Sequence, residues 1–422
     1  MKIILIIPPS PFLGDQKRNP SLGVMYIAAF LEKQGYDVGI SDLRNLKEEY
    51  WLDKAPVADV YGLTAATPEY PLAVKIARHL KSRDKKCLIV LGGIHATADK
   101  NNLDPVFDSV ITGEGELAML DLLKDFEKGS SKKYYQGSFI ENLDELPFPA
   151  RHLLPLDSVF SDKLCIKGEM ATSIIASRGC PYNCSFCASK AMWGRKVRFR
   201  SPDNVIAEIK EVIEKYNVRQ FRFQDDTIAA NRDWLFELAE KMKPLNIVWR
   251  ANNRVNCSQK DILLAMKEAG CYEIDYGIES LSENVLKINN KLIKVEDIYA
   301  AVKTAKDVGL KIRLFFMIGL PGQNKDEGDK IIKFIEEVRP DGVDVSTLIP
   351  FPGCDIYNDP SKYNIEILNR DFSSYVFTLG LYGDEAEKDF IFKHDILSNE
   401  ELKQERRKIL EYIRNYNLTL NK

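Results

Sequence analysis

The cysteine-rich segment near the middle of the chain holds the residues best suited to chemistry. Three of the eight cysteines, Cys180, Cys184 and Cys187, fall within eight positions in the order C-x3-C-x2-C. Three thiolates on one loop can hold three irons of a 4Fe–4S cluster and leave the fourth iron open. A structural zinc site takes four protein ligands, and the nearest spare candidates, Cys165 and His152, form no second ligand pair. The spacing therefore predicts an iron–sulfur cluster, with zinc or three structural thiols as alternatives.

Composition narrows the class of protein that carries this segment. The apolar fraction of 45% and charged fraction of 29% are typical of a globular protein, and 422 residues suffice for two or three domains. A net charge of −3 gives no electrostatic case for nucleic acid or an anionic membrane as the main partner. The first residues lack the features of a signal peptide, and no run approaches the ~20 apolar residues of a membrane span. We therefore expect a cytoplasmic protein, in which crowded cysteines indicate metal rather than disulfides.

Two successive alternations of strand-like and helix-like segments must position these residues. In residues 1–128, short apolar strands alternate with helical segments, which predicts a parallel sheet with helices on both faces. The strand candidates are Lys2–Ile7, Asp37–Ser41, Asp59–Leu63, Cys87–Leu91 and Ser109–Thr112. Residues 129–165, rich in turn-forming residues, are expected to be a linker.

The second alternation, in residues 166–350, has six strand–helix units and predicts a partial barrel. Its strand candidates are Thr172–Ala176, Gln220–Phe223, Ile247–Arg250, Glu273–Gly277, Lys311–Ile318 and Gly342–Ile349. The cysteines follow the first of these strands, at the carboxyl end where such barrels carry their chemistry. Residues 351–422 are expected to form a C-terminal extension that ends in a covering helix over Glu400–Tyr412.

The cysteine spacing, with Phe186 before the last cysteine, is the signature of the radical S-adenosylmethionine (SAM) superfamily. The segment W-G-R-K-V-R-F-R-S-P at 193–202 and the domain at 1–128 resemble the cobalamin-binding branch of that superfamily. This resemblance implies an α/β fold with a Rossmann-like parallel sheet of the cobalamin-binding type, a partial (β/α)6 radical SAM barrel and a helical C-terminal extension. The methylthiotransferase branch fits less well, because its first domain brings three further cysteines and residues 1–128 contain only Cys87.

The resemblance also assigns SAM-binding residues at the carboxyl ends of the later strands. Of the acidic pair after the second strand, Asp225 is expected to meet the SAM amino group and Asp226 to support it, with a helix cap as the alternative. On the third strand, Arg250 or Arg254 could pair with the SAM carboxylate, although either could instead make an ordinary ion pair. The other expected SAM contacts are Phe186, Glu279, Ser280, Ile318 and Gly319.

Small and turn-forming residues end the strands of the first sheet, where parallel sheets bind ligands. No G-x-G-x-x-G follows the first strand, which disfavours a dinucleotide. Cobalamin-dependent mutases ligate cobalt through the histidine of D-x-H-x-x-G, whereas here Asp42 is followed by leucine and arginine. We therefore expect cobalamin with no histidine on cobalt, His95 being the one residue that could overturn this. The predicted cobalamin site is Ser10, Thr64, Thr67, Gly92, Gly93, His95, Gly113, Glu114 and Gly115.

The function implied by the resemblance is radical chemistry. SAM cleavage would give a 5′-deoxyadenosyl radical that takes hydrogen from an unactivated carbon, and methylcobalamin would supply a methyl group. The leading prediction is a C-methyltransferase that acts on a small molecule or peptide and uses an external electron donor such as flavodoxin or ferredoxin. Oxidation, cyclisation or ring rearrangement without methyl transfer is the alternative within the branch, and a non-catalytic iron–sulfur or corrinoid carrier is the alternative of another class. Candidate substrate contacts outside the motifs are Tyr272, Tyr375 and Tyr382, although packing in the protein interior is the favoured role for these tyrosines.

Overall fold

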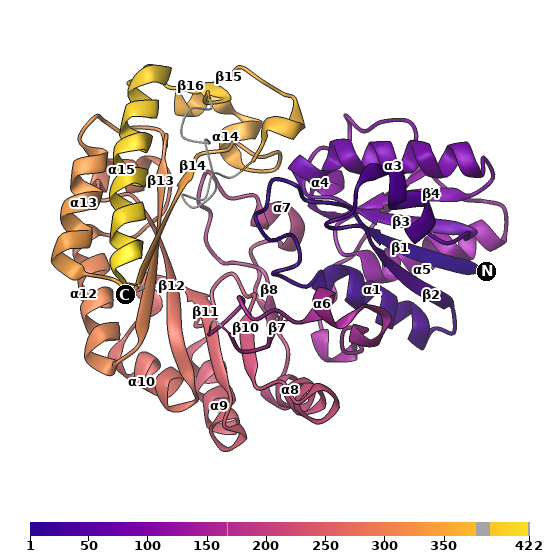
Figure 1. Ribbon diagram of the computed structural model, residues 1–422, viewed down its shortest axis with the longest axis horizontal. Helices are drawn as coiled ribbons and strands as arrows, with labels where there is room; N and C mark the ends of the chain where they lie inside the picture. Colours follow the sequence, from indigo (N-terminus) through magenta and orange to yellow (C-terminus); the bar gives the residue numbers. More distant parts are fainter. Residues whose placement is uncertain (167, 377–388, 421–422) are drawn as a thin grey trace.

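Two parallel six-stranded sheets, one in each half of the chain, organise the fold (Figure 1). The structure is a computed structural model that describes residues 1–166, 168–376 and 389–420. It confirms the predicted α/β class, with an N-terminal parallel sheet followed by a second parallel sheet and additional helices. No helix among the described residues is long and apolar enough to cross a membrane.

The N-terminal sheet has the strand order β2-β1-β3-β4-β5-β6. Its interior strand β1 is an almost uninterrupted apolar run, as expected for a strand buried on both faces. Odd-numbered residues of β1 such as Leu5 pack with one helical layer, which includes Met25 and Met119, whereas Ile4 and Ile6 pack with the other. The strands are β1 (Lys2–Ile7), β2 (Asp37–Asp42), β3 (Val60–Thr64), β4 (Leu88–Gly92), β5 (Ser109–Thr112) and β6 (Tyr134–Gln136). The helices are α1 (Leu22–Lys33), α2 (Trp51–Lys54), α3 (Tyr70–Arg83), α4 (Gly93–Ala98) and α5 (Gly115–Glu127).

Strand β6 lies within the segment that the sequence predicts to be a linker. It pairs with β5 in parallel, with Ile111 opposite Tyr135. Of its three residues only Tyr135 is buried, so the segment has too few apolar positions to show the alternation of a strand. Its place at the edge of the sheet follows from pairing with β5, which the local sequence does not encode.

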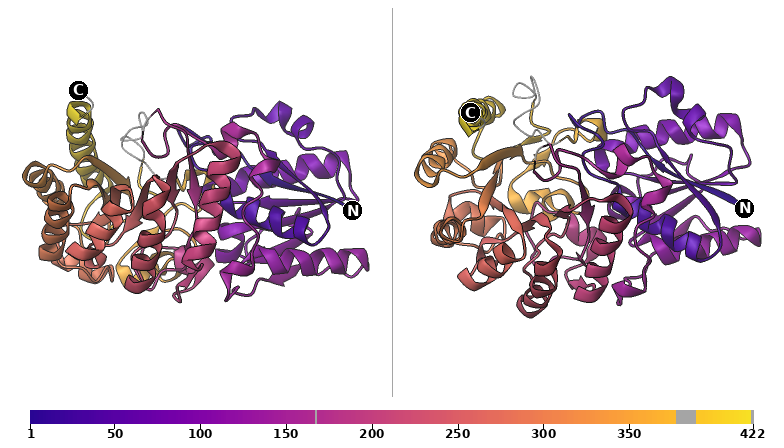
Figure 2. Two further views of the ribbon diagram at one scale, coloured as in Figure 1. Left: turned by 90° about the horizontal axis from the view of Figure 1, so that it is seen from below. Right: turned by 60° about the horizontal axis from the view of Figure 1, so that its bottom comes forward.

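The second sheet has the order β14-β13-β12-β11-β10-β7 and is also parallel throughout. Figures 1 and 2 show its helices on the outside of the curved sheet. The strands are β7 (Ala171–Ile174), β10 (Gln220–Phe223), β11 (Val248–Asn253), β12 (Cys271–Glu279), β13 (Lys311–Ile318) and β14 (Gly342–Thr347). The helices are α8 (Pro202–Tyr216), α9 (Arg232–Met242), α10 (Lys260–Glu268), α11 (Glu283–Ile288), α12 (Val295–Val308) and α13 (Glu327–Val338).

The C-terminal helix α15 (Asn399–Leu420) covers α13 and β14, as the sequence predicts, but it is longer than the predicted Glu400–Tyr412. Glu405 of α15 accepts a hydrogen bond from the backbone N–H of Gly328 at 2.9 Å, which fixes the helix on the first turn of α13. The remaining elements are α6 (Leu156–Val159), α7 (Ser189–Trp193), α14 (Asp355–Asn358), β8 (Ser177–Arg178), β9 (Arg198–Phe199), β15 (Glu366–Ile367) and β16 (Phe392–Lys393).

Buried ion pairs join the two domains on either side of the cysteines. Arg178 of β8 pairs with Glu116 at 2.6 Å, and Arg198 of β9 pairs with Glu114 at 2.5 Å. β8 and β9 form a short antiparallel pair in which Arg178 lies opposite Arg198. The basic segment at 193–202 therefore holds the N-terminal domain against the barrel. Glu114 is committed to this contact, so its predicted role as a cobalamin-binding residue is not supported by its position.

Candidate active site

The cysteine loop is held in place by contacts with three other segments. Gly179 has a φ of +108° and lies against the backbone of Lys196. An added Cβ would be 2.5 Å from the carbonyl oxygen of Lys196, so only glycine fits there. Ser185 donates a hydrogen bond from Oγ to Oδ1 of Asn289 at 2.9 Å, and its carbonyl accepts from the N–H of Ile356 at 3.1 Å. The loop is therefore fixed by its surroundings before any cofactor binds.

All three cysteines of this loop line one cavity of about 510 Å³. The cavity opens at the carboxyl ends of β10 to β14, and the N-terminal domain closes its other side with Phe12, Leu13 and Pro68. Five neighbouring strands line its barrel side, with Arg222, Asn252, Asp275, Phe315 and Ser346 among the residues that they contribute. The two domains together thus enclose a space that borders both the cysteines and a polar barrel floor.

The donor set in this cavity fits an iron–sulfur cluster. Burial raises the pKa of Cys180, and it raises that of Cys187 to about 12. The guanidinium of Arg254 lies 3.6 Å from Sγ of Cys184 and can stabilise thiolate charge there. Among the described residues, no three His, Cys, Asp or Glu side chains are placed to hold a single metal ion. A cluster uses separate irons, so its three cysteines need not converge on one point.

Three of the predicted SAM contacts, Phe186, Asp226 and Glu279, line the same cavity. Glu279 has φ of +69°, which is rare for a residue other than glycine, and it follows a bulge in the pairing of β12 with β13. Bulges redirect side chains near functional sites, and Glu279 here meets Nζ of Lys291 at 3.0 Å. No sequence motif predicts Lys291, because the bulge and the following loop decide its position.

Asp225 and Arg250, which are also predicted SAM contacts, are not among the residues that line this cavity. Asp225 is buried and accepts hydrogen bonds from the N–H of Ala176 and the hydroxyl of Ser177, and burial raises its pKa to about 6. It therefore braces the strand that leads to the cysteines. Arg250 is buried beneath the cavity floor, where it pairs with Asp275 at 2.7 Å and with Glu273 at 2.8 Å.

Arg254 is the alternative that the third strand offered, and it does line the cavity. Its side chain stacks on Tyr182, with the guanidinium carbon 3.8 Å from the ring centroid. Arg254 is only 6% exposed, yet its Nε and Nη2 have no hydrogen-bond partner among the described residues. A buried guanidinium with spare donors is suited to a carboxylate ligand.

Ser280, Ile318 and Gly319 are not among the residues that line the cavity. Ser280 is buried and donates its hydroxyl hydrogen bond to Glu327 at 2.5 Å. An added Cβ at Gly319 would lie 2.9 Å from the ring of Phe392. These three residues support the loops behind the cavity, and nothing in the local sequence separates that role from a direct contact.

We expect Asp226→Asn to weaken SAM binding by roughly 10- to 150-fold, because one charge-assisted hydrogen bond is worth about 1.5–3 kcal/mol. Asp226 reaches the cavity and accepts a hydrogen bond from Ser189 at 2.5 Å, which leaves its other oxygen for the SAM ammonium group. Anaerobic calorimetry with the cluster-loaded protein measures the affinity, and iron content checks that the cluster is retained. An unchanged affinity would remove Asp226 from the site.

A second cavity, of about 110 Å³, lies in the N-terminal domain. Most of the predicted cobalamin residues line it, namely Thr64, Gly92, Gly93, Gly113 and Gly115, and Gly23 and Gly62 join them. Added Cβ atoms at Gly23 and Gly92 would meet nothing closer than 4.0 Å, so these glycines leave open space. An apolar cavity with bare backbone on several sides fits part of a large cofactor that must approach the sheet closely.

Four predicted cobalamin residues do not line this cavity. Ser10 donates a hydrogen bond to Glu69, and Glu114 is held by the arginines described above. His95 is 0% exposed, its ring lies between those of Tyr70 and Phe372, and its Nδ1 is 3.3 Å from Oγ1 of the buried Thr67. Burial lowers the pKa of His95 to about 4, so this histidine is a neutral packing residue.

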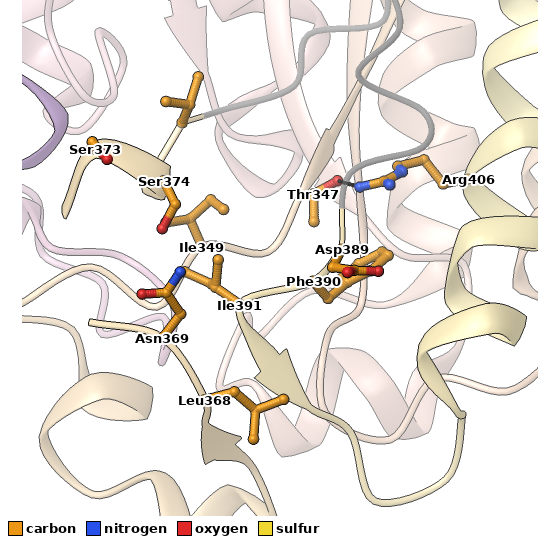
Figure 3. A pocket seen from close by; sticks show the side chains of 11 residues that line it. Thr347, Ile349, Leu368, Asn369, Ser373, Ser374, Asp389, Phe390, Ile391 and Arg406 are labelled. Carbon is orange, nitrogen blue, oxygen red and sulfur yellow. Dashed lines mark hydrogen bonds between the residues drawn. The ribbon is translucent and has the colours of Figure 1, made fainter. Parts of the chain in front are cut away.

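A third cavity, of about 580 Å³, lies beside the C-terminal extension (Figure 3). Ser346 of β14 lines the cysteine cavity, whereas the next residue, Thr347, lines this one. Successive side chains of a strand point to opposite faces, so this cavity lies on the outer face of the barrel sheet. Tyr375, a candidate substrate contact, is buried beside it; Tyr272 lies on the amino-terminal part of β12, and Tyr382 lies outside the described residues.

Comparison with protein families finds two matches, one in each half of the chain. The radical SAM superfamily matches residues 174–335, and the B12 binding domain matches residues 16–123. The first range contains the cysteine loop and most of the second sheet, and the second contains the cavity lined by glycines.

Relatives cover nearly the whole chain. An uncharacterized methyltransferase of Pyrococcus horikoshii is 31% identical over 404 residues, which cover 89% of this chain and 86% of the relative. An anaerobic magnesium-protoporphyrin IX monomethyl ester cyclase of Rubrivivax gelatinosus is 26% identical over 91% of this chain and 74% of the relative. The radical SAM methyltransferase TsrM of Kitasatospora setae, solved with cobalamin and a [4Fe-4S] cluster, shares the fold with a TM-score of 0.65 at 16% identity, covering 84% of this chain and 73% of that one.

Proposed function

The chain belongs to the cobalamin-binding branch of the radical SAM superfamily, and we propose that it is a C-methyltransferase that modifies an unactivated carbon. It is an enzyme of the cobalamin-dependent radical SAM type. The observation that carries the proposal is the cavity of about 510 Å³, because the three cysteines, polar side chains of the barrel floor and residues of the N-terminal domain all line it. A methyl donor held by that domain would face the substrate there.

In this proposal the side chains hold, orient and enclose the reacting groups. A 4Fe–4S cluster with SAM supplies hydrogen abstraction, and cobalamin supplies the methyl group. Cys180, Cys184 and Cys187 hold the cluster, while Asp226 and Arg254 bind the amino and carboxylate groups of SAM. Phe12 and Leu13 of the N-terminal domain help to exclude water from the cavity. An external electron donor such as flavodoxin or ferredoxin completes the set of partners.

The barrel floor supports a polar small molecule as the substrate. Arg222 lines the cavity and donates hydrogen bonds to Asp275 at 3.0 Å and to Asn252 at 3.1 Å. These bonds fix its guanidinium and leave other N–H groups of the same side chain for a ligand. A substrate bound here would lie inside the barrel, in the same cavity as the cysteines.

Product analysis tests methyl transfer directly. We expect the anaerobically reduced holoenzyme to form both S-adenosylhomocysteine and 5′-deoxyadenosine with its substrate, because methyl transfer would consume one SAM as the methyl source and hydrogen abstraction would consume a second. The similarity to a cyclase keeps cyclisation as the second candidate function. Formation of 5′-deoxyadenosine without S-adenosylhomocysteine would favour that candidate, and absence of both products would leave a non-catalytic carrier.

The cobalt of bound cobalamin is expected to carry no histidine of this chain. His95 is enclosed by aromatic rings and does not line the glycine cavity. The electron paramagnetic resonance spectrum of the cob(II)alamin-loaded protein should therefore be the same in wild type and in His95→Phe, which keeps a ring in the packed position. Nitrogen superhyperfine splitting that disappears in the variant would show that His95 binds cobalt.

A further inference from the structure

The turn that begins α5 alternates between two kinds of contact. Gly113 and Gly115 line the cavity of the N-terminal domain. Glu114 and Glu116, which alternate with them, turn toward the barrel and pair with the arginines of β8 and β9. In the four consecutive residues 113–116, the two glycines line the cavity of the N-terminal domain and the two glutamates contact the barrel domain.

Arg178 pairs with both glutamates, and it precedes Cys180 by two residues. Its Nη2 lies 2.6 Å from Glu116, and its Nη1 lies 3.3 Å from Glu114. The guanidinium also lies between two aromatic rings, 5.4 Å from the centroid of Tyr26 and 5.1 Å from that of Trp193. Every charge in this group is nearly fully buried, so the geometry cannot relax freely without exposing or unpairing a charge.

The segment after the cysteines also contacts Arg178 and the cavity of the N-terminal domain. Trp193, the last residue of α7, covers Arg178, and the residue before it, Met192, lines the glycine cavity. The hydroxyl of Thr97 lies 3.8 Å from Sδ of Met192. That hydroxyl donates its hydrogen bond to the carbonyl of Gly93 at 2.9 Å and accepts one from the N–H of Gly113 at 3.0 Å. The cysteine loop is therefore tied to the wall of the glycine cavity both before its first cysteine and after its last.

We propose that Glu116 and Arg178 are positioning residues that couple occupancy of the glycine cavity by cobalamin to the geometry of the cysteine loop. The proposal rests on the cofactors of the proposed function and does not depend on methyl transfer. A ligand in contact with Gly113 and Gly115 changes or fixes the positions of Glu114 and Glu116, which alternate with them. The glutamates act on Arg178, which fixes the backbone that leads into Cys180. Because such coupling is reciprocal, SAM bound at the cysteines must change the affinity for cobalamin by the same factor.

The test compares SAM binding with and without cobalamin in cluster-loaded protein. In wild type we expect hydroxocobalamin to tighten SAM binding by at least about fivefold, the lower end of the range for coupled sites. In Glu116→Gln the ratio should fall to about one, although cobalamin and iron are still bound. Glu116→Asp, which keeps the charge, should retain part of the effect. Glu208→Gln is the matched control, because Glu208 is a buried carboxylate whose ion-pair partners, Arg151 and Arg200, lie outside the turn at 113–116.

Hydrogen exchange gives a readout that does not depend on the variants. In wild type, cobalamin should slow exchange in residues 176–200, which are distant in sequence from the glycine turn. The proposal is overturned if cobalamin changes neither exchange nor SAM affinity in wild type, or if Glu116→Gln keeps the full ratio. A protein that binds no cobalamin, seen from its absorption spectrum, would instead contradict the proposed function.

Discussion

Replacing Cys180, Cys184 and Cys187 together with alanine is expected to abolish cluster binding and all SAM cleavage. The three thiols are the cysteines that line the cavity of about 510 Å³, and a cluster held by three protein ligands has no other anchor once they are removed. Iron and sulfide analysis after anaerobic reconstitution should fall from about four of each per chain to background. Formation of 5′-deoxyadenosine in the presence of a reductant should fall below detection.

Cys257→Ala is the matched control for this loss. Cys257 is half-buried and its Sγ lies 3.4 Å from the hydroxyl of Tyr182, so it is close to the loop, but it does not line the cavity. The control should keep its iron and its SAM cleavage. Retention of about four irons by the triple variant would overturn the cluster assignment.

Gly23→Leu is expected to abolish cobalamin binding while the protein stays folded. Gly23 lies on α1 and lines the glycine cavity, and no atom comes within 4 Å of an added Cβ. A leucine side chain would therefore have room at its Cβ, and its remaining carbons would occupy part of a space of about 110 Å³ and leave little room for a ligand. Because leucine favours helix over glycine by roughly 0.5–1 kcal/mol, the variant should not lose stability from its backbone.

The measurement is the cobalamin bound after anaerobic reconstitution, quantified from its absorption spectrum. Gly23→Ala is the control, since one methyl group fills little of the cavity, and it should retain most of the binding. Thermal unfolding of the apo proteins checks that both variants fold like wild type. Full cobalamin loading of the leucine variant would show that cobalamin does not use this cavity.

Much of the fold can be predicted from the sequence because its signals are local. The apolar strands with helices between them define two parallel sheets, and β1 and β13 match their predicted bounds. The cysteine spacing is also local, so Cys180, Cys184 and Cys187 are found without knowledge of the fold. The short edge strand β6 is not predicted, because it has a single buried residue, Tyr135, and one residue cannot show the alternation of a strand.

Only the tertiary structure decides between neighbouring residues of the same type. Asp225 and Asp226 are adjacent, yet the first points into the barrel domain and the second into the cavity. Arg250 lies on β11 and Arg254 lies in the loop that follows it. Arg250 forms ion pairs with Glu273 and Asp275 of β12. Sequence patterns show which residue types are present at a strand end. They do not show which carboxylate or guanidinium is already paired with a residue of another strand.

The same reason separates the residues predicted for cobalamin. The glycines can be identified because any large ligand at a sheet edge must approach the backbone closely, and glycine permits that approach. Glu114 and His95 have the right chemistry at the right edge, but Arg198 and Phe372, distant in sequence, bury them. The sequence alone determines the two sheets and the glycine-rich edge, and it predicts the three cysteines of the cluster. Long-range pairing of charges and rings decides which polar side chains remain free to meet a ligand, because every buried charge must first find its partner.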